Sequence, residues 1–187
     1  MVDLPQLWAE LESRWPESII DPSLTRIVSV MELLGDPQRA YPVIQVAGTN
    51  GKTSTARMIE SVIRAYGLRT GLFTSPHLVD ARERIRLDGA PVTAERLLDT
   101  WNDIEPYVRL VDKNSTESGG VPLSYFEVIT SLAYAAFADA PVDVAIIEVG
   151  MGGTWDATSV AAASVAAARS ASRASSACRA RAAASPA

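Results

Sequence analysis

The chain has 187 residues, of which 48% are apolar and 21% are charged, so it can bury a hydrophobic core and is not disordered as a whole. Its apolar runs are too short to span a membrane, and its first residues lack a basic and apolar leader, so we expect a cytoplasmic protein. The single cysteine, Cys178, cannot form an internal disulfide. A net charge of −5 disfavours a nucleic-acid-binding surface.

Hydrophobic periodicity, capping residues and glycines divide most of the chain into segments. In chain order these are a helix over 4–15, a helix over 24–34, a strand over 43–47, a helix that ends at Gly67, a strand over 70–74, a polar loop over 75–91, a helix that starts at Thr93, a mobile loop over 112–120, a helix over 124–138 and a strand over 142–149. Strands that alternate with helices imply parallel pairing. The predicted fold class is therefore α/β, with a P-loop-type parallel sheet and flanking helices.

The composition changes abruptly near residue 158. All 22 acidic residues lie at or before Asp156, whereas residues 159–187 hold 14 alanines, seven serines and four arginines. Such a segment has few large apolar side chains to offset the entropy of ordering it. We predict one domain over 1–158 and a low-complexity tail over 159–187 that is disordered or read from a shifted frame.

The loop after the first predicted strand has the composition of a phosphate-binding loop. It reads Gly48-Thr49-Asn50-Gly51-Lys52-Thr53-Ser54. The glycines let main-chain N–H groups turn toward a polyphosphate, whose charge the following helix N-terminus also favours. Lys52 would reach the β- and γ-phosphates, and Thr53 would place its hydroxyl on Mg²⁺. This loop is shorter than the usual P-loop, and the alternative is a plain strand–helix turn with an exposed lysine.

Polar residues also follow the other two predicted strands, where open α/β sheets place their ligands. Ser75 and His77 come after the second strand, and Glu148 lies near the end of the third. A hydroxyl and a carboxylate beside a phosphate loop suit Mg²⁺, which prefers oxygen ligands. The alternatives are a loop cap for Ser75 and a solvated strand-end charge for Glu148.

Four motifs occur in order along the chain. They are G-T-N-G-K-T at 48–53, S-P-H-L-V-D-A-R-E-R-I-R at 75–86, L-S-Y-F-E at 123–127 and E-V-G-M-G-G-T-W-D-A-T at 148–158. Over about residues 24–158 the chain resembles the folylpolyglutamate synthase/dihydrofolate synthase family of the Mur ligase superfamily. The resemblance implies the ATPase domain of a cytoplasmic, monomeric amide ligase. Such an enzyme uses ATP to add L-glutamate to dihydropteroate or folyl(poly)glutamate through an acyl phosphate.

The resemblance also implies roles for individual residues. The implied ATP-binding residues run from Gly48 to Ser54, with catalytic roles for Lys52 and Glu148. The implied magnesium ligands are Ser75 and Glu148, to which the phosphate-loop pattern adds Thr53. The implied pterin-binding residues are His77, Arg84, Phe126 and Asp156. On the sequence alone, His77 is equally compatible with a loop residue that has no role. The alternative for Tyr125 and Phe126 is helix core, and Phe126 is compatible with both.

Some features of that family do not occur in this sequence. The family has a metal-ligating histidine and a carbamylated lysine further along, whereas His77 is the only histidine here and no lysine follows Lys113. We therefore expect an inactive fragment whose sheet ends at a third strand, so that residues 142–149 lie beside an unfilled position. The alternatives are another Mur-type ligase, acting on peptidoglycan precursors, and a non-catalytic nucleotide- or pterin-binding module.

Overall fold

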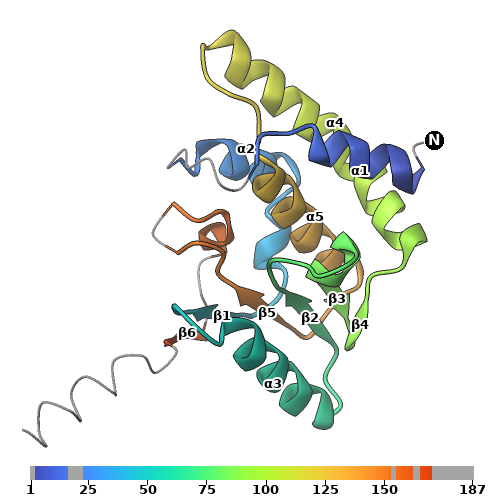
Figure 1. Cartoon of the computed structure of the whole chain (residues 1–187), viewed down its shortest axis with the longest axis vertical. Helices are drawn as coiled ribbons and strands as arrows, with labels where there is room; N and C mark the ends of the chain where they lie inside the picture. The colour runs from blue at the N-terminus through green and yellow to red at the C-terminus, as the bar shows by residue number, and fades with distance from the viewer. Residues whose placement is uncertain (1–2, 17–22, 153–154, 162–164, 170–187) are drawn as a thin grey trace, which may run out of the picture.

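The computed structural model describes residues 3–16, 23–152, 155–161 and 165–169, which form one mixed sheet with helices on both faces (Figure 1). The strands are β1 Val43–Ala47, β2 Thr70–Phe73, β3 Ile85–Leu87, β4 Ala90–Pro91, β5 Val144–Glu148 and β6 Val165–Arg169. The helices are α1 Leu4–Glu12, α2 Thr25–Leu33, α3 Lys52–Ala65, α4 Ala94–Glu117 and α5 Tyr125–Asp139, with short 3-10 helices η1 Pro37–Arg39, η2 Ala81–Arg84 and η3 Ala157–Val160. No helix in these ranges is long and apolar enough to cross a membrane.

The strand order is β4-β3-β2-β5-β1-β6. The strands β1, β2, β5 and β6 are parallel, which confirms the α/β class, whereas β3 and β4 pair antiparallel at one edge. The expectation that β5 borders an unfilled position is wrong, because Ala145 pairs with Val43 on one side and Gly71 on the other. The crossover from β1 through α3 to β2 skips one strand position, and β5 fills it.

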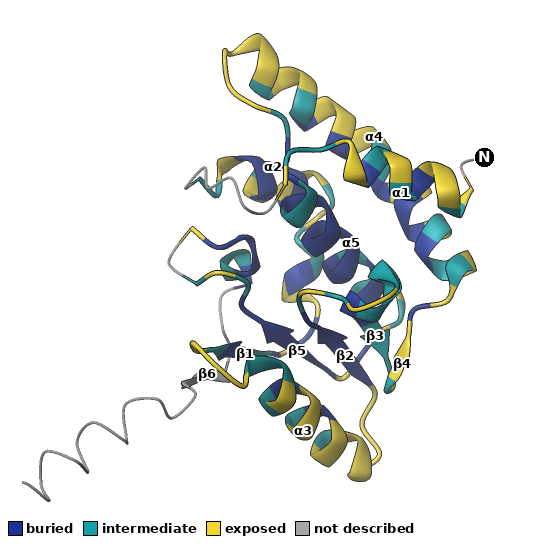
Figure 2. Cartoon of the chain, viewed as in Figure 1, coloured by how far each residue is buried: buried dark blue, intermediate teal, exposed yellow. Residues whose placement is uncertain are grey.

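The side chains of the central strands alternate between two apolar layers. Val46, Leu72 and Ile146 pack against α3 on one face. The other face carries Ala145 and Ile147 and belongs to the main core, which α1, α2, α4 and α5 build. Figure 2 shows α5 and the central strands buried, and the outer sides of α1, α3 and α4 exposed. Because alternation continues along β5, Glu148 follows Ile146 onto the side of α3.

The α5 helix packs very closely on β2. A Cβ added to Gly71 would lie 2.7 Å from the ring of Phe137, so only glycine allows this approach. Helix α5 starts where the sequence predicts, since the Ser124 side chain accepts a hydrogen bond from the main-chain N–H of Glu127. Ser124, Phe126 and Glu127, at the start of α5, line the same cavity as Lys52.

Two segments predicted as loops are regular structure. The α4 helix runs through most of the expected 112–120 loop, because Asp112 is held by Arg14 at 2.9 Å and by the main-chain N–H of Leu123 at 2.7 Å. Within the expected polar loop 75–91, β3 and β4 form a hairpin. Its two-residue turn is Asp88-Gly89, whose φ angles of 50° and 82° are those of a type I′ turn.

The described part of the predicted tail also differs from the expectation. Residues 157–160 form η3, and 165–169 pair as β6 with the free edge of β1. An edge strand offers unpaired main-chain N–H and C=O groups. A neighbouring segment of any composition can form hydrogen bonds with them, because the pairing uses main-chain atoms alone. Residues 170–187, with Cys178, lie outside the described residues, so the domain boundary at 158 stays a prediction.

Candidate functional site

The predicted phosphate loop joins β1 to α3 at the carboxyl end of the parallel strands. Gly51 is the N-cap of α3, with a left-handed φ of 74° that favours glycine. It has no side chain to bind the first N–H groups of the helix, so these donors point out of an exposed loop. This arrangement suits an anionic ligand at the start of α3.

Three residues predicted as metal ligands lie together beside this loop. The Thr53 hydroxyl donates to both carboxylate oxygens of Glu148, at 3.0 and 2.9 Å. The main-chain N–H of Ser75 donates to the same carboxylate at 3.4 Å. Glu148 is only 2% exposed, and this burial raises its pKa above the ordinary glutamate value. The two hydrogen bonds and the charges of Lys52 and Arg57 act in the opposite direction but do not cancel the shift.

The donor set fits a magnesium ion that is bound partly by the nucleotide. The described part of the chain contains no group of three histidine, cysteine, aspartate or glutamate side chains that could hold a metal. Mg²⁺ is commonly held by one or two carboxylates, waters and substrate phosphates, so one carboxylate with the Thr53 and Ser75 hydroxyls is sufficient. Glu148 is a buried carboxylate with no hydrogen-bonded cation among the described residues, and a metal would compensate its charge.

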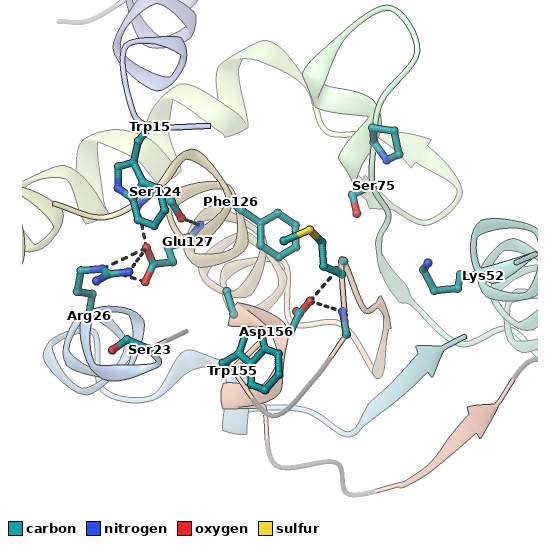
Figure 3. A pocket seen from close by; sticks show the side chains of 15 residues that line it. Trp15, Ser23, Arg26, Lys52, Ser75, Ser124, Phe126, Glu127, Trp155 and Asp156 are labelled. Atoms are coloured by element: carbon teal, nitrogen blue, oxygen red, sulfur yellow. Dashed lines mark hydrogen bonds and ion pairs between the residues drawn. The ribbon is translucent and has the colours of Figure 1, made fainter. Parts of the chain in front are cut away.

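A cavity of about 300 Å³ extends from this site toward α2 and α5 (Figure 3). Lys52 and Ser75 lie at one end, and Trp15, Arg26 and Glu127 at the other. Its lining residues are Trp15, Ser23, Arg26, Lys52, Ser75, Pro76, Ser124, Phe126, Glu127, Gly150, Met151, Gly152, Trp155, Asp156 and Ala157. The structure therefore brings the phosphate-loop lysine, Phe126 and Asp156 to one cavity.

Phe126 forms part of the wall between the two ends of the cavity. The centre of its ring lies 5.9 Å from the centre of the Phe73 ring, which belongs to the core. A Cβ on Gly150 would lie 2.7 Å from Phe126 and 3.2 Å from the Asp156 carboxylate. The glycine after β5 thus lets the loop pass directly beneath the ring. Phe126 is therefore packed on the core and is also part of the cavity wall, and its role in pterin binding stays a prediction.

Asp156 holds the loop that follows β5. One carboxylate oxygen accepts the main-chain N–H groups of Met151 and Gly152, at 3.0 and 3.2 Å. The other accepts the N–H and hydroxyl of Thr158, at 3.0 and 2.6 Å. A carboxylate offers about four lone-pair sites, and these bonds use them all. A hydrogen bond to a pterin would therefore replace one of them.

His77 and Arg84 do not line the cavity. The Arg84 guanidinium is buried, donates from Nε to His77 Nδ1 at 2.9 Å, and lies 5.1 Å from the centre of the Tyr125 ring. Tyr125 itself precedes Phe126 at the start of α5 and does not line the cavity.

The far end of the cavity contains residues that the sequence did not point to. Arg26 pairs with Glu127 at 3.2 and 3.3 Å, and its guanidinium lies 5.4 Å from the centre of the Trp15 ring. The S-x-x-E spacing from Ser124 does predict a capping box, and Glu127 Oε2 accepts the Ser124 N–H at 2.8 Å. The partnership with Arg26, 101 residues earlier, has no local signal.

Comparison with known proteins assigns the family. No family model matches the chain. It is 57% identical over 159 residues to the dihydrofolate synthase/folylpolyglutamate synthase of Mycobacterium tuberculosis, a match that covers 83% of this chain and 33% of that protein. The solved structure of M. tuberculosis folylpolyglutamate synthase complexed with ADP matches with a TM-score of 0.81 and 54% identity, covering 86% of this chain and 35% of that one. This chain belongs to the folylpolyglutamate synthase family.

A more distant member of the folylpolyglutamate synthase family has the same fold. Its complex with AMPPCP and folate matches with a TM-score of 0.76 and 34% identity, covering 85% of this chain and 38% of that one. The predicted family and fold class are thereby confirmed. The match spans 33% of the length of the M. tuberculosis protein and 16–22% of the other curated relatives.

Proposed function

We propose that this chain is the part of an ATP-dependent folate glutamate ligase that binds the nucleotide phosphates and the pterin-bearing substrate. The observation that carries the proposal is the buried Glu148 carboxylate, which is bonded to Thr53 and to Ser75. Ser75 and Lys52 line one end of the cavity. The relatives solved with ADP, AMPPCP and folate support the same ligands here.

The proposed reaction activates a carboxylate before it forms an amide. The γ-phosphoryl group of ATP passes to the substrate carboxylate, and the amine of glutamate then displaces phosphate from the acyl phosphate. Lys52 and the N–H groups of α3 would hold the phosphates and stabilise the charge that develops on them. Glu148, Thr53 and Ser75 would hold a Mg²⁺, which when bound neutralises charge on the β- and γ-phosphates.

The cavity offers an aromatic middle section with a charged far end. Phe126 and the half-exposed Trp155 provide aromatic faces for a ring system. Arg26 and Glu127 lie beyond them, and the loop held by Asp156 closes one side. We assign this cavity to the pterin of dihydropteroate or folate, with glutamate as the third substrate.

We further propose that ligation requires more than these residues, because the match spans only 33% of the M. tuberculosis protein. A cytoplasmic location and a monomeric parent enzyme stay predictions. A non-catalytic nucleotide- or pterin-binding module is the second candidate, favoured by the intact phosphate loop with Lys52 beside the cavity.

Titration calorimetry with MgADP tests the proposal. We expect weak binding that falls about 10-fold or more in Lys52→Ala, since a charge-assisted contact with phosphate is lost. Lys113→Ala is the matched control, because Lys113 is the only other lysine and lies on α4 beside Glu117. Equal affinity of Lys52→Ala and the parent chain would contradict the proposal. Folate binding that is lost in Phe126→Ala would separate the pterin assignment from the nucleotide assignment.

A further inference from the structure

The contact between Arg84 and His77 fixes the position of a proton. Arg84 Nε donates to His77 Nδ1 at 2.9 Å. A guanidinium carries donors only and stays charged, so the imidazole nitrogen that faces it must be an unprotonated acceptor. The proton of the neutral His77 ring therefore lies on Nε2.

Arg84 is itself held firmly in place. Its side chain is 4% exposed and stacks on Tyr125, the first residue of α5. It lies at the end of η2, which starts with a capping box between Asp80 and Glu83. The Glu83 carboxylate also binds the main-chain N–H groups of Leu78 and Val79, at 3.0 and 3.2 Å. The segment between His77 and Arg84 is thus tied to itself and to α5.

The opposite edge of the His77 ring is available to a ligand. His77 is partly exposed, and its Nε2 makes no hydrogen bond to any residue in the described ranges. Two residues earlier, Ser75 lines the cavity and donates its main-chain N–H to Glu148. The free donor of His77 therefore belongs to the loop that forms the phosphate end of the cavity.

We propose that Arg84 is a positioning residue that holds His77 as the Nε2–H tautomer, so that His77 offers one fixed donor to an anionic oxygen of a bound ligand. Arg84 then acts through His77 and does not touch the pterin. The second half of this inference rests on the proposed function. The terminal phosphate of the nucleotide and the carboxylate of the pteroate-type substrate share the required chemistry, and the test distinguishes them.

The tautomer can be read without any ligand. Because His77 is the only histidine, a ¹⁵N-histidine-labelled chain gives the imidazole signals of one residue. At about pH 8.5, where an ordinary imidazole is neutral, we expect a protonated Nε2 and an unprotonated, hydrogen-bonded Nδ1. In Arg84→Met the two nitrogen shifts should move toward each other as the Nδ1–H form becomes populated. Arg82→Met, which removes a guanidinium of η2 that pairs with Asp80, should leave the spectrum unchanged.

Ligand titrations test the donor. MgAMPPCP and folate are added separately to the labelled chain, and the one that His77 contacts should shift the Nε2 signal. Two further variants at this partly exposed position do not depend on whether Arg84→Met folds. A glutamine amide nitrogen reaches the position of Nε2, whereas that of asparagine reaches only as far as Nδ1. We expect His77→Gln to keep the affinity for that ligand within about 3-fold, and His77→Asn to lose about 10-fold.

The outcomes are separable. A protonated Nδ1 in the parent chain, or unchanged nitrogen shifts in a folded Arg84→Met, would overturn the positioning role whatever the chain binds. If a ligand binds and neither titration moves the Nε2 signal, or if Gln and Asn behave alike, His77 is not a ligand donor. If neither ligand binds the parent chain, the proposed function fails and the donor role fails with it, while the tautomer result stands by itself.

Discussion

The hydroxyl of Tyr134 donates a hydrogen bond of 2.8 Å to the main-chain carbonyl of Thr158, deep in the core. The same carbonyl accepts a bond of 2.7 Å from the side-chain amide of Gln45 on β1. Burial raises the pKa of Tyr134 well above its ordinary value, so the hydroxyl keeps its proton and stays a donor. The loop held by Asp156 is in this way fastened to α5 and to the sheet.

Tyr134→Phe should lower the free energy of unfolding by about 1 kcal/mol. The loss is modest because Gln45 continues to satisfy the carbonyl of Thr158. Thermal unfolding followed by circular dichroism measures it. Tyr107→Phe, at a half-exposed site on α4, is the control and should leave the midpoint temperature of thermal unfolding unchanged. A Tyr134→Phe variant as stable as the parent would mean that Gln45 alone fastens the loop.

Glu148→Gln should stabilise the chain in the absence of metal at neutral pH. Burial raises the pKa of Glu148, so the folded state binds a proton more readily than the unfolded state does. Stability therefore falls as pH rises above the ordinary glutamate value of about 4.3, and the glutamine variant avoids this loss. Denaturant unfolding from pH 4 to 8 should show the two proteins converging at low pH and separating toward pH 8. Parallel curves would show that Glu148 titrates normally.

Gly150→Ala should weaken folate binding and leave MgADP binding within about 2-fold, since the added Cβ would lie 2.7 Å from Phe126. The ring or the loop must move, and both form the cavity wall. Calorimetric titration with each ligand measures the two affinities on one sample. An unchanged folate affinity would contradict the assignment of Phe126 to the substrate site.

Glu127→Gln should cost about 3 kcal/mol of stability, because it removes the negative charge that pairs with the buried Arg26 guanidinium. The glutamine can still accept the main-chain N–H of Ser124, so the helix cap is kept. Asp139→Asn is the matched control. It breaks an exposed ion pair with Arg96 at 3.0 Å and should cost less than about 1 kcal/mol. Equal effects of the two substitutions would show that burial does not govern the Arg26–Glu127 pair.

Local signals predicted the parts of the fold and site that depend on neighbours in sequence. The glycine loop with Lys52 lies between a strand and a helix as expected, and Glu148 lies at the end of a strand. Ser124 starts α5 because its capping box needs only four consecutive residues. In each case the interacting groups are separated by a few positions, so the pattern is visible in the sequence.

Features that join distant segments were not predictable in this way. Nothing local to β5 indicates that it lies between β1 and β2, since its partners come from segments about 70 and 100 residues earlier in the chain. The pairing of Arg26 with Glu127 and the use of all acceptors of Asp156 likewise depend on the assembled core. The β3–β4 hairpin is different, because Asp88-Gly89 is a recognisable turn within a stretch that reads as polar loop.

The central place of β5 has a consequence for synthesis. β1 and β2 each pair with β5 and not with one another, and β5 is the last of the three to leave the ribosome. A nascent chain that has emerged only through α5 therefore holds two strands whose inner edges have no partner. A translational pause between α5 and β5 would prolong that state. The rate at which this short stretch is decoded should thus influence how much of the newly made protein reaches its folded form.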